Sequence, residues 1–343
     1  MDNANVLGYA AKAVGQPLEP IEYPSPELGD HDVRVAVTHC GLCHTDIHAV
    51  DDYYGITHYP FVPGHEIVGY VSAAGPAVSG LKEGDRVGIG WQGRSCLKCE
   101  WCSKGEEHLC MDIVPSAVWD PYGGFSTSVV ADGRFAYRLP PALRSPVAAV
   151  LMCAGVSVYA PLRDCAAKSR HNIAVVGVGG LGHLAIQFAQ ALGCEVTAVS
   201  SSPGKRDECL AFGADHFINA NDPDSLHRVE FAFDMLLCTA SGGVRWEALL
   251  KALKKRGRLV LLGFPDLALN STDLVAHELS ITGSLFGNRA TMREMLDFAQ
   301  DHGISPEVEL MPMSQVNEAF QRLRSNKARY RIVLVNDTAG TPA

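Results

Sequence analysis

The sequence lacks the features that mark nucleic-acid-binding and membrane-spanning proteins. Its 29 Lys and Arg residues are outnumbered by 38 Asp and Glu residues, so the formal net charge is −9. The longest basic run is Lys254-Lys255-Arg256, which we interpret as a solvated helix end. Nucleic-acid affinity comes mainly from clustered Lys and Arg side chains that neutralise phosphates, so this balance argues against a nucleic-acid partner. No stretch approaches the ~18 consecutive apolar residues of a membrane helix.

The first residues do not have the basic and apolar composition of a secretory signal. The chain begins Met1-Asp2-Asn3-Ala4-Asn5, which is acidic and polar, unlike a secretory signal, and we expect a cytoplasmic protein. Because the cytosol keeps thiols reduced, clusters among the 11 cysteines are expected to bind metal or act in catalysis and not to form disulfides. A composition of 47% hydrophobic and 20% charged residues is typical of globular proteins, and a length of 343 residues predicts about two domains.

The two halves of the chain differ in hydrophobic period. The first ~150 residues contain short strands and turns, at 33–37, 67–71 and 81–89, and predict an all-β, barrel-like domain. From Asn172 the pattern becomes strand (173–176), glycine-rich turn, helix (181–192) and strand (195–199), which is a βαβ unit. Further strands are expected at 216–218, 235–238 and 258–262, so we expect a doubly wound parallel sheet. Two helices (291–300, 313–325) and a strand (331–335) follow.

Four cysteines in one loop give the strongest chemical signal. Two, two and seven residues separate Cys96, Cys99, Cys102 and Cys110. Four thiolates complete the tetrahedral shell of Zn²⁺ and leave no open position, which predicts a structural zinc site. The alternatives are an iron–sulfur cluster or four unconnected buried cysteines.

A second group of potential ligands is spread over three segments. These are 40–48, with Cys40, Cys43, His44 and His48; 63–66, with His65 and Glu66; and 151–155, with Cys153. Each is weak alone, because a single His or Cys is often a packed core residue. Together they offer thiolate, imidazole and carboxylate, which are the ligands of a catalytic zinc that keeps an exchangeable position.

A glycine-rich turn indicates a dinucleotide site. The turn follows a predicted strand, opens a predicted helix, and contains Gly177, Gly179, Gly180, Leu181 and Gly182. Glycines let the backbone approach a pyrophosphate, whose charge is stabilised by free N–H groups at the helix N-terminus.

The end of the second strand of this unit favours NADPH over NADH. NAD sites place an acid there to bind the ribose 2′-hydroxyl. Here the chain offers Ser200, Ser201, Ser202, Lys205 and Arg206, which supply donors and positive charge for a 2′-phosphate. An ordinary serine-rich turn is the alternative.

Together these motifs resemble the zinc-dependent medium-chain alcohol dehydrogenases, and within them the cinnamyl alcohol dehydrogenase-like branch. The resemblance spans essentially the whole chain and follows one order of motifs: 41–46, 63–66, the four-cysteine loop, 153–155, 177–183 and 200–206.

The resemblance implies roles for individual residues of the second group. Cys43, His65 and Cys153 match the catalytic zinc ligands, Glu66 matches an exchangeable fourth ligand, and Cys40 falls to a structural role. Asp46 matches the carboxylate that orients the zinc-bound imidazole. Thr45 and His48 match a proton relay through hydroxyl, ribose and imidazole, and His44 matches a contact with the cofactor pyrophosphate. The implied reaction is hydride transfer between NADP(H) and a primary alcohol or aldehyde, with two zinc ions per chain.

Substrate-pocket positions, domains and assembly also follow from the resemblance. Four residues match pocket positions of the family: Tyr54, Trp91, Leu285 and Phe286. They favour medium-chain or aromatic substrates, although ordinary core packing would explain these residues equally well. The implied architecture is a GroES-like catalytic domain (1–152 and 289–343) interrupted by a Rossmann NADP-binding domain (153–288). Family members are homodimers or homotetramers. Small buried hydrophobic roles are expected for the remaining cysteines, Cys165, Cys194, Cys209 and Cys238.

Three other functions are compatible with parts of this pattern. Medium-chain reductases of carbon–carbon double bonds often lose a zinc ligand or the relay, yet both sets stand here. A non-enzymatic NADPH-binding protein would not need the ligands of a catalytic zinc, Cys43, His65, Glu66 and Cys153. A polyol dehydrogenase would favour an acid after the second strand, where this chain has Ser200.

Overall fold

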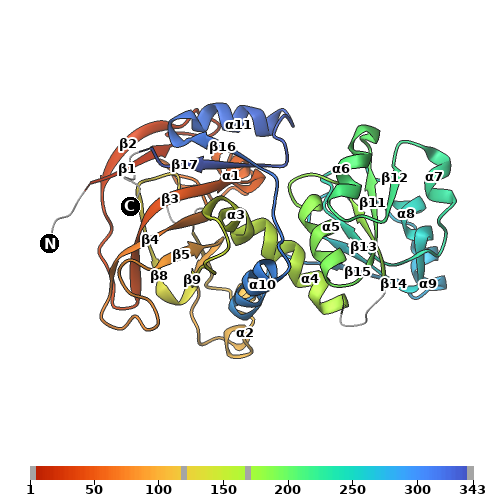
Figure 1. Ribbon diagram of the computed structural model, residues 1–343, viewed down its shortest axis with the longest axis horizontal. Coiled ribbons are helices and arrows are strands. Elements are labelled where there is room, and N and C mark those ends of the chain that lie inside the picture. The colour runs from red at the N-terminus through yellow and green to blue at the C-terminus, as the bar shows by residue number, and fades with distance from the viewer. Residues whose placement is uncertain (1–4, 117–121, 167–170, 338–343) are drawn as a thin grey trace. The chain divides into compact units, whose positions relative to one another are not determined.

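The structure is a computed structural model that describes residues 5–116, 122–166 and 171–337 (Figure 1). Its described chain forms two compact units. The first unit comprises Met1–Cys153, Asn288–Gln300 and Pro306–Ala343, and the second comprises Ala154–Gly287 and Asp301–Ser305. The chain therefore leaves the first unit at Cys153 and returns to it near its C-terminal end.

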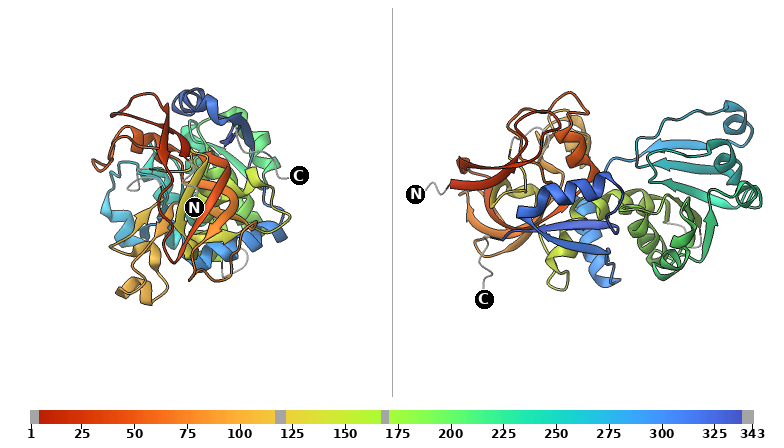
Figure 2. Two further views of the ribbon diagram at one scale, coloured as in Figure 1. Left: turned by 90° about the vertical axis from the view of Figure 1, so that its left-hand side faces the viewer. Right: turned by 90° about the horizontal axis from the view of Figure 1, so that it is seen from above.

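A seven-stranded mixed sheet forms the centre of the first unit. The strand order is β16-β17-β3-β4-β5-β9, with β8 paired to β3. The C-terminal strand β17 (Arg331–Val335) lies antiparallel to β3 (Asp32–Leu42), so blue and orange segments run side by side in Figures 1 and 2. Alternating apolar residues of β3, including Val33, Val35 and Val37, are fully buried in one core.

The other elements of this unit are short. They are β1 (Asn5–Ala10), β2 (Glu19–Pro24), α1 (His44–Val50), β4 (Glu66–Ala74), β5 (Arg86–Ile89), β6 (Gln92–Arg94), α2 (Glu100–Ser103), η1 (Glu107–Leu109), β7 (Val114–Pro115), β8 (Ser128–Asp132), η2 (Gly133–Phe135), β9 (Ala136–Arg138), α3 (Ser145–Val150), α10 (Arg289–Asp301), β16 (Val308–Pro312), η5 (Met313–Gln315) and α11 (Val316–Arg324).

A six-stranded, fully parallel sheet forms the second unit. Its order is β12-β11-β10-β13-β14-β15, which in chain order is 3-2-1-4-5-6, the arrangement of a dinucleotide-binding fold. Helices cover both faces, with α5 on one side and α8 and α9 on the other (Figure 1). Continuous apolar runs in β10 and β13 agree with strands buried on both faces.

The bounds of the second unit's elements complete the description. They are α4 (Val156–Ala166), β10 (Asn172–Val176), α5 (Gly182–Ala191), β11 (Glu195–Ser200), η4 (Pro203–Lys205), α6 (Arg206–Ala211), β12 (His216–Asn219), α7 (Pro223–His227), β13 (Phe233–Cys238), α8 (Trp246–Ala252), β14 (Leu253–Leu261), α9 (Ser271–Ala276) and β15 (Ser280–Gly283).

One helical run corrects the expectation that no segment comes near membrane length. Helix α3, the π-helical turn η3 (Leu151–Gly155) and α4 follow one another, and Ser145–Arg163 reaches a mean hydropathy of 1.6 over a length that could span a bilayer. However, 78% of that window is buried inside the protein, which is the property of a core helix.

The predicted parallel strands are confirmed, and two local expectations are wrong. Helices α1 and α3 lie within the first ~150 residues, where only short strands and turns were expected. The basic run from Lys254 to Arg256 belongs to β14 and not to a helix end, because Leu253 pairs with Phe233 and the Lys254 ammonium lies 2.8 Å from the Asp234 carboxylate.

Candidate metal and cofactor sites

Three elements of the first unit bring four potential ligands together. Cys43 precedes α1, His65 and Glu66 lie at the start of β4, and Cys153 sits in the π-helical turn η3. One ligand atom from each residue lies within 4.8 Å of the other three. π-Helical turns redirect side chains and are frequent at functional sites. The structure therefore brings together the four residues of the expected catalytic zinc site, whereas the fully buried Cys40 stays in the core.

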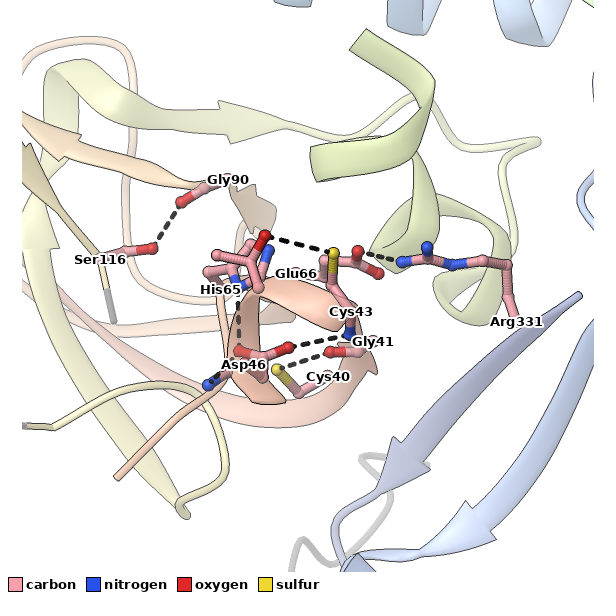
Figure 3. A network of polar contacts seen from close by, with 11 residues as sticks. Cys40, Gly41, Cys43, Asp46, His65, Glu66, Gly90, Ser116 and Arg331 are labelled. Atoms are coloured by element: carbon pink, nitrogen blue, oxygen red, sulfur yellow. Dashed lines mark hydrogen bonds and ion pairs between the residues drawn. The ribbon is translucent and has the colours of Figure 1, made fainter. Parts of the chain in front are cut away.

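Asp46 fixes this cluster from below (Figure 3). Its carboxylate accepts hydrogen bonds from the backbone N–H groups of Cys43 (2.9 Å) and Gly64 (3.0 Å), and Oδ1 lies 2.9 Å from Nδ1 of His65. Asp46 is only 1% exposed. Because Nδ1 is occupied by the carboxylate, Nε2 is the ring nitrogen left to bind a ligand.

Glu66 is held by an arginine that sequence reasoning missed. Oε1 forms a buried ion pair with the guanidinium of Arg331, on the C-terminal strand β17 (Figure 3). The other oxygen, Oε2, lies so close to Gly41 that a Cβ at that position would clash with it. Arg331 is 265 positions away in sequence, so no local motif could have indicated it.

The donor set fits a metal ion. Nε2 of His65 and Oε2 of Glu66 are completely buried, and neither has a hydrogen-bond partner among the described residues. Unpaired buried polar atoms cost about 1–3 kcal/mol each, a cost that coordination would remove. Two thiolates, an imidazole and a carboxylate are ligands that Zn²⁺ accepts.

Electrostatics inside the cluster favour a thiolate at Cys43. A hydrogen bond from Cys153, and then the nearby His65 and Arg331, hold the pKa of Cys43 well below its ordinary value. The same bond, together with burial, raises the pKa of Cys153. Burial raises the pKa of Glu66 to about 7, against the opposing charge of Arg331. Burial by itself would lower the pKa of His65, but the Asp46 carboxylate raises it well above the usual range.

The four-cysteine loop forms a second cluster. Its sulfur atoms lie within 4.8 Å of one another, with Cys96 Sγ 3.5 Å from Cys110 Sγ and 3.9 Å from Cys102 Sγ. Tetrahedral Zn²⁺ with 2.3 Å Zn–S bonds would separate sulfurs by about 3.8 Å. Backbone N–H groups of Lys98 and Cys99 lower the pKa of Cys96 to about 7, which favours a thiolate. These four sulfurs fit a metal held only by protein ligands.

A buried glutamate anchors this loop to its own unit. Glu107 is 4% exposed, and its carboxylate lies 2.6 Å from the guanidinium of Arg289 on α10. The Glu107 carbonyl also accepts a hydrogen bond from the Gln92 side chain (2.9 Å). The contact of Glu107 with Arg289 joins residues 182 positions apart, and no sequence signal had pointed to it.

The glycine turn is placed between β10 and α5 as predicted. Gly177 has φ of +90°, and a Cβ on Gly182 would clash with the Gly177 carbonyl, so both positions require glycine. A Cβ on Gly179 would meet nothing within 4 Å, which leaves open space beside the helix N-terminus. Gly180 and Leu181 complete the turn before α5 begins.

The serine-rich segment after β11 lies beside this turn. The Lys205 ammonium donates a hydrogen bond to the Val178 carbonyl (2.7 Å) inside the glycine turn. Ser200 is buried, and its hydroxyl accepts a hydrogen bond from the Ser202 N–H (3.2 Å), whereas Ser201 and Ser202 are exposed. The described side chains of this segment therefore present hydroxyls and a cation close to the glycine turn.

Helix α1 carries the expected relay residues. The Thr45 hydroxyl lies 3.7 Å from Cys43 Sγ, and His48 follows three positions later, on the same side of the helix. The His44 ring is 6.4 Å from that of His48, and its pKa is lowered mainly by burial. The Tyr54 hydroxyl lies 3.4 Å from Nδ1 of His48.

The other expected pocket residues belong to both units, with Trp91 in the first and Leu285 and Phe286 in the second. Trp91 is half-buried between β5 and β6, Leu285 is 50% exposed after β15, and Phe286 is half-buried beside it. Of the cysteines expected to be small buried residues, Cys194, Cys209 and Cys238 are buried, and Cys165 lies outside the described side chains.

Comparison with known proteins identifies related chains. A model of the alcohol dehydrogenase GroES-like domain matches residues 29–141, and a model of zinc-binding dehydrogenases matches 180–301. An aldehyde reductase of Synechocystis is 38% identical over 96% of this chain and 98% of its own, and an 8-hydroxygeraniol dehydrogenase of Catharanthus roseus is 40% identical over 98% and 95%. A cinnamyl alcohol dehydrogenase structure from Sorghum bicolor superposes with a TM-score of 0.93 at 38% identity, covering 99% of this chain and 100% of the other.

Proposed function

Because the chain belongs to the zinc-dependent medium-chain alcohol dehydrogenases, in the cinnamyl alcohol dehydrogenase-like branch, we propose that it interconverts primary medium-chain or aromatic alcohols and their aldehydes with NADP(H). The family and the fold class expected from the motifs are confirmed. One observation carries the proposal: a buried cluster of Cys43, His65, Glu66 and Cys153 contains an imidazole nitrogen with no hydrogen-bond partner among the described residues.

Each residue of the cluster has a role in this proposal. Cys43, His65 and Cys153 would hold a zinc ion, with Glu66 as exchangeable ligand, and that ion would act as a Lewis acid on the alcohol or aldehyde oxygen. Asp46 keeps the His65 ring in one orientation and supplies it with electron density. Arg331 holds the Glu66 carboxylate by Oε1, and the buried Oε2 has no hydrogen-bond partner among the described residues.

Proton movement is assigned to helix α1. The Thr45 hydroxyl, beside Cys43, is the group that would exchange a proton with the substrate oxygen. His48, three positions later, is half-exposed and would exchange that proton with solvent, since an imidazole can both accept and donate a proton.

Cofactor choice and metal content belong to the same proposal. Ser200, Ser201, Ser202 and Lys205 would recognise the 2′-phosphate of NADPH, and His44 would contact its pyrophosphate. The glycine turn would receive the pyrophosphate in the open space at Gly179. The structure of a protein named CAD from Helicobacter pylori, complexed with NADP(H), is 28% identical and superposes with a TM-score of 0.89, which supports this cofactor.

The four-cysteine loop would hold a second, structural zinc, giving two ions per chain.

Domain roles, assembly and location complete the proposal. Residues 1–152 and 289–343 would form the catalytic domain and 153–288 the NADP-binding domain. A homodimer or homotetramer is supported by exposed apolar side chains near the edge strand β15, where Val275 is 78%, Phe264 67% and Leu285 50% exposed. A cytoplasmic location suits the free cysteines of both clusters.

The test is NADPH oxidation by zinc-replete protein with cinnamaldehyde or benzaldehyde, beside an NADH control. We expect turnover with NADPH well above that with NADH. Absence of turnover with either cofactor, in protein that binds zinc, would favour a double-bond reductase or a non-enzymatic NADPH-binding protein.

A further inference from the structure

The imidazole of His48 lies between two consecutive tyrosines. Tyr53 stacks on it, with ring centroids 4.8 Å apart and an interplanar angle of 25°. Tyr54 meets it edge-on, at 6.0 Å and 79°, and its hydroxyl lies 3.4 Å from Nδ1 of His48. The two tyrosines also contact each other at 5.3 Å and 88°. One nitrogen of the ring therefore has a protein partner, and one face of the ring is covered.

Backbone contacts fix this arrangement. The N–H of Tyr53 donates to the His48 carbonyl (2.9 Å), so the chain folds back over the end of α1. Asp52 takes φ of +51°, and its carboxylate accepts the N–H of Thr57 (2.9 Å). Asp51 forms two bonds with the Arg324 guanidinium, of 2.5 and 2.6 Å. The turn that presents both tyrosines is thus held at both ends.

We propose that the Tyr54 hydroxyl is a positioning group that keeps the His48 imidazole in one orientation while the ring gains and loses a proton. A hydroxyl oxygen accepts hydrogen bonds, so it can accept from the Nδ1–H of both the neutral ring and the imidazolium, while Nε2 gains and loses the proton. The ring then need not rotate between the two states, and Nε2 stays available for proton transfer. The inference rests on the proposed relay role of His48.

Two further facts suit Tyr54 to this role. Burial raises its pKa above the ordinary value, so the phenol keeps its proton at neutral pH and its oxygen stays a neutral acceptor. It is also 37% exposed, compared with 66% for Tyr53, so the Tyr54 ring is the more enclosed of the two. A residue that only shaped an apolar pocket would act through its ring and would not need the hydroxyl.

The variant Tyr54→Phe isolates the hydroxyl, because it keeps the ring. Orientation is only part of the effect of a general acid–base group, which is worth about 10²–10⁴-fold, so we expect kcat for NADPH-dependent aldehyde reduction to fall about five- to tenfold. KM for the aldehyde should stay within about twofold. The matched control is Tyr59→Phe, which removes a hydroxyl bond from the Val50 carbonyl at the end of the same helix (2.9 Å) without touching His48. Its kcat should be unchanged.

A second measurement separates this inference from the relay itself. In ¹⁵N-labelled protein, assigned with His48→Asn, the ring-nitrogen shifts of His48 should report one dominant tautomer, which becomes a mixture in Tyr54→Phe and stays single in Tyr59→Phe. If His48→Asn keeps full activity, the relay proposal fails, and the shifts alone decide whether Tyr54 fixes the ring. Unchanged shifts in Tyr54→Phe, a raised KM with intact kcat, or an equal loss of kcat in Tyr59→Phe would overturn the inference.

Discussion

Oδ1 of Asp46 lies 2.9 Å from Nδ1 of His65, in a part of the first unit where both side chains are 1% exposed. The bond joins helix α1 to the start of strand β4, and therefore ties the segment of Cys43 to that of His65 and Glu66. Asp46 also accepts two backbone N–H groups, so each oxygen of its carboxylate is used. One buried carboxylate thus arranges three of the four potential ligands.

Replacing Asp46 with Asn should weaken metal binding at this cluster. An amide group would turn a donor toward one of the three groups that now donate to the carboxylate, and the imidazole would lose its charged partner. We expect zinc affinity to fall about 10- to 100-fold, measured by competition with a chromogenic chelator. Asp85→Asn, which disturbs a surface pair with Arg138, is the control and should leave the affinity unchanged.

Zinc content should separate the two clusters. Purified protein should contain two zinc ions per chain by elemental analysis. Cys43→Ala should retain one ion and lose turnover, whereas Cys99→Ala should also retain one ion but lower the thermal midpoint, because a closed four-thiolate site contributes folding energy. Two ions and full activity in Cys43→Ala would reject the catalytic ligand assignment.

A negative charge at Ser200 should move cofactor preference toward NADH. Ser200 ends β11, where NAD-preferring sites carry an acid, and an added carboxylate would repel a 2′-phosphate. For Ser200→Asp we expect the ratio of kcat/KM for NADPH to that for NADH to fall about 10- to 100-fold, given about 1–3 kcal/mol of repulsion. Ser72→Asp, on β4 of the first unit, adds the same charge elsewhere. An equal change in both variants would contradict the specificity argument.

Asp132 should make stability depend on acid pH. Burial alone would raise its pKa, but hydrogen bonds from the Arg134 side chain and backbone lower it below the ordinary value. A carboxyl with a lowered pKa in the folded protein stabilises it above the unfolded pKa of about 4, and this stabilisation is lost as pH falls through the folded value. Urea unfolding should find Asp132→Asn less stable by about 1 kcal/mol at pH 7. The difference should shrink below about pH 4, and a constant difference would contradict this account.

Local sequence carried much of the fold and most of the ligand set. The four-cysteine spacing, the glycine turn and the period of the parallel strands are short-range patterns, so they survive without knowledge of distant contacts. Prediction from local patterns was wrong where tertiary pairing overrides the secondary structure that the local sequence favours. The basic run at Lys254 joined a strand because Leu253 pairs with Phe233 and Lys254 with Asp234.

By itself, then, the sequence determined which chemical groups are present and in what order: thiolates, imidazoles, a glycine turn and a serine-rich strand end. Spacing alone left Cys40 and Cys43 as alternatives, and the structure separates them, with Cys43 in the ligand cluster and Cys40 in the core. Only the tertiary structure could pair Glu66 with Arg331, Glu107 with Arg289, and His48 with the hydroxyl of Tyr54. The first two pairs join residues 265 and 182 positions apart, and the third depends on a turn whose direction is set by backbone bonds, so neither periodicity nor motif spacing encodes them.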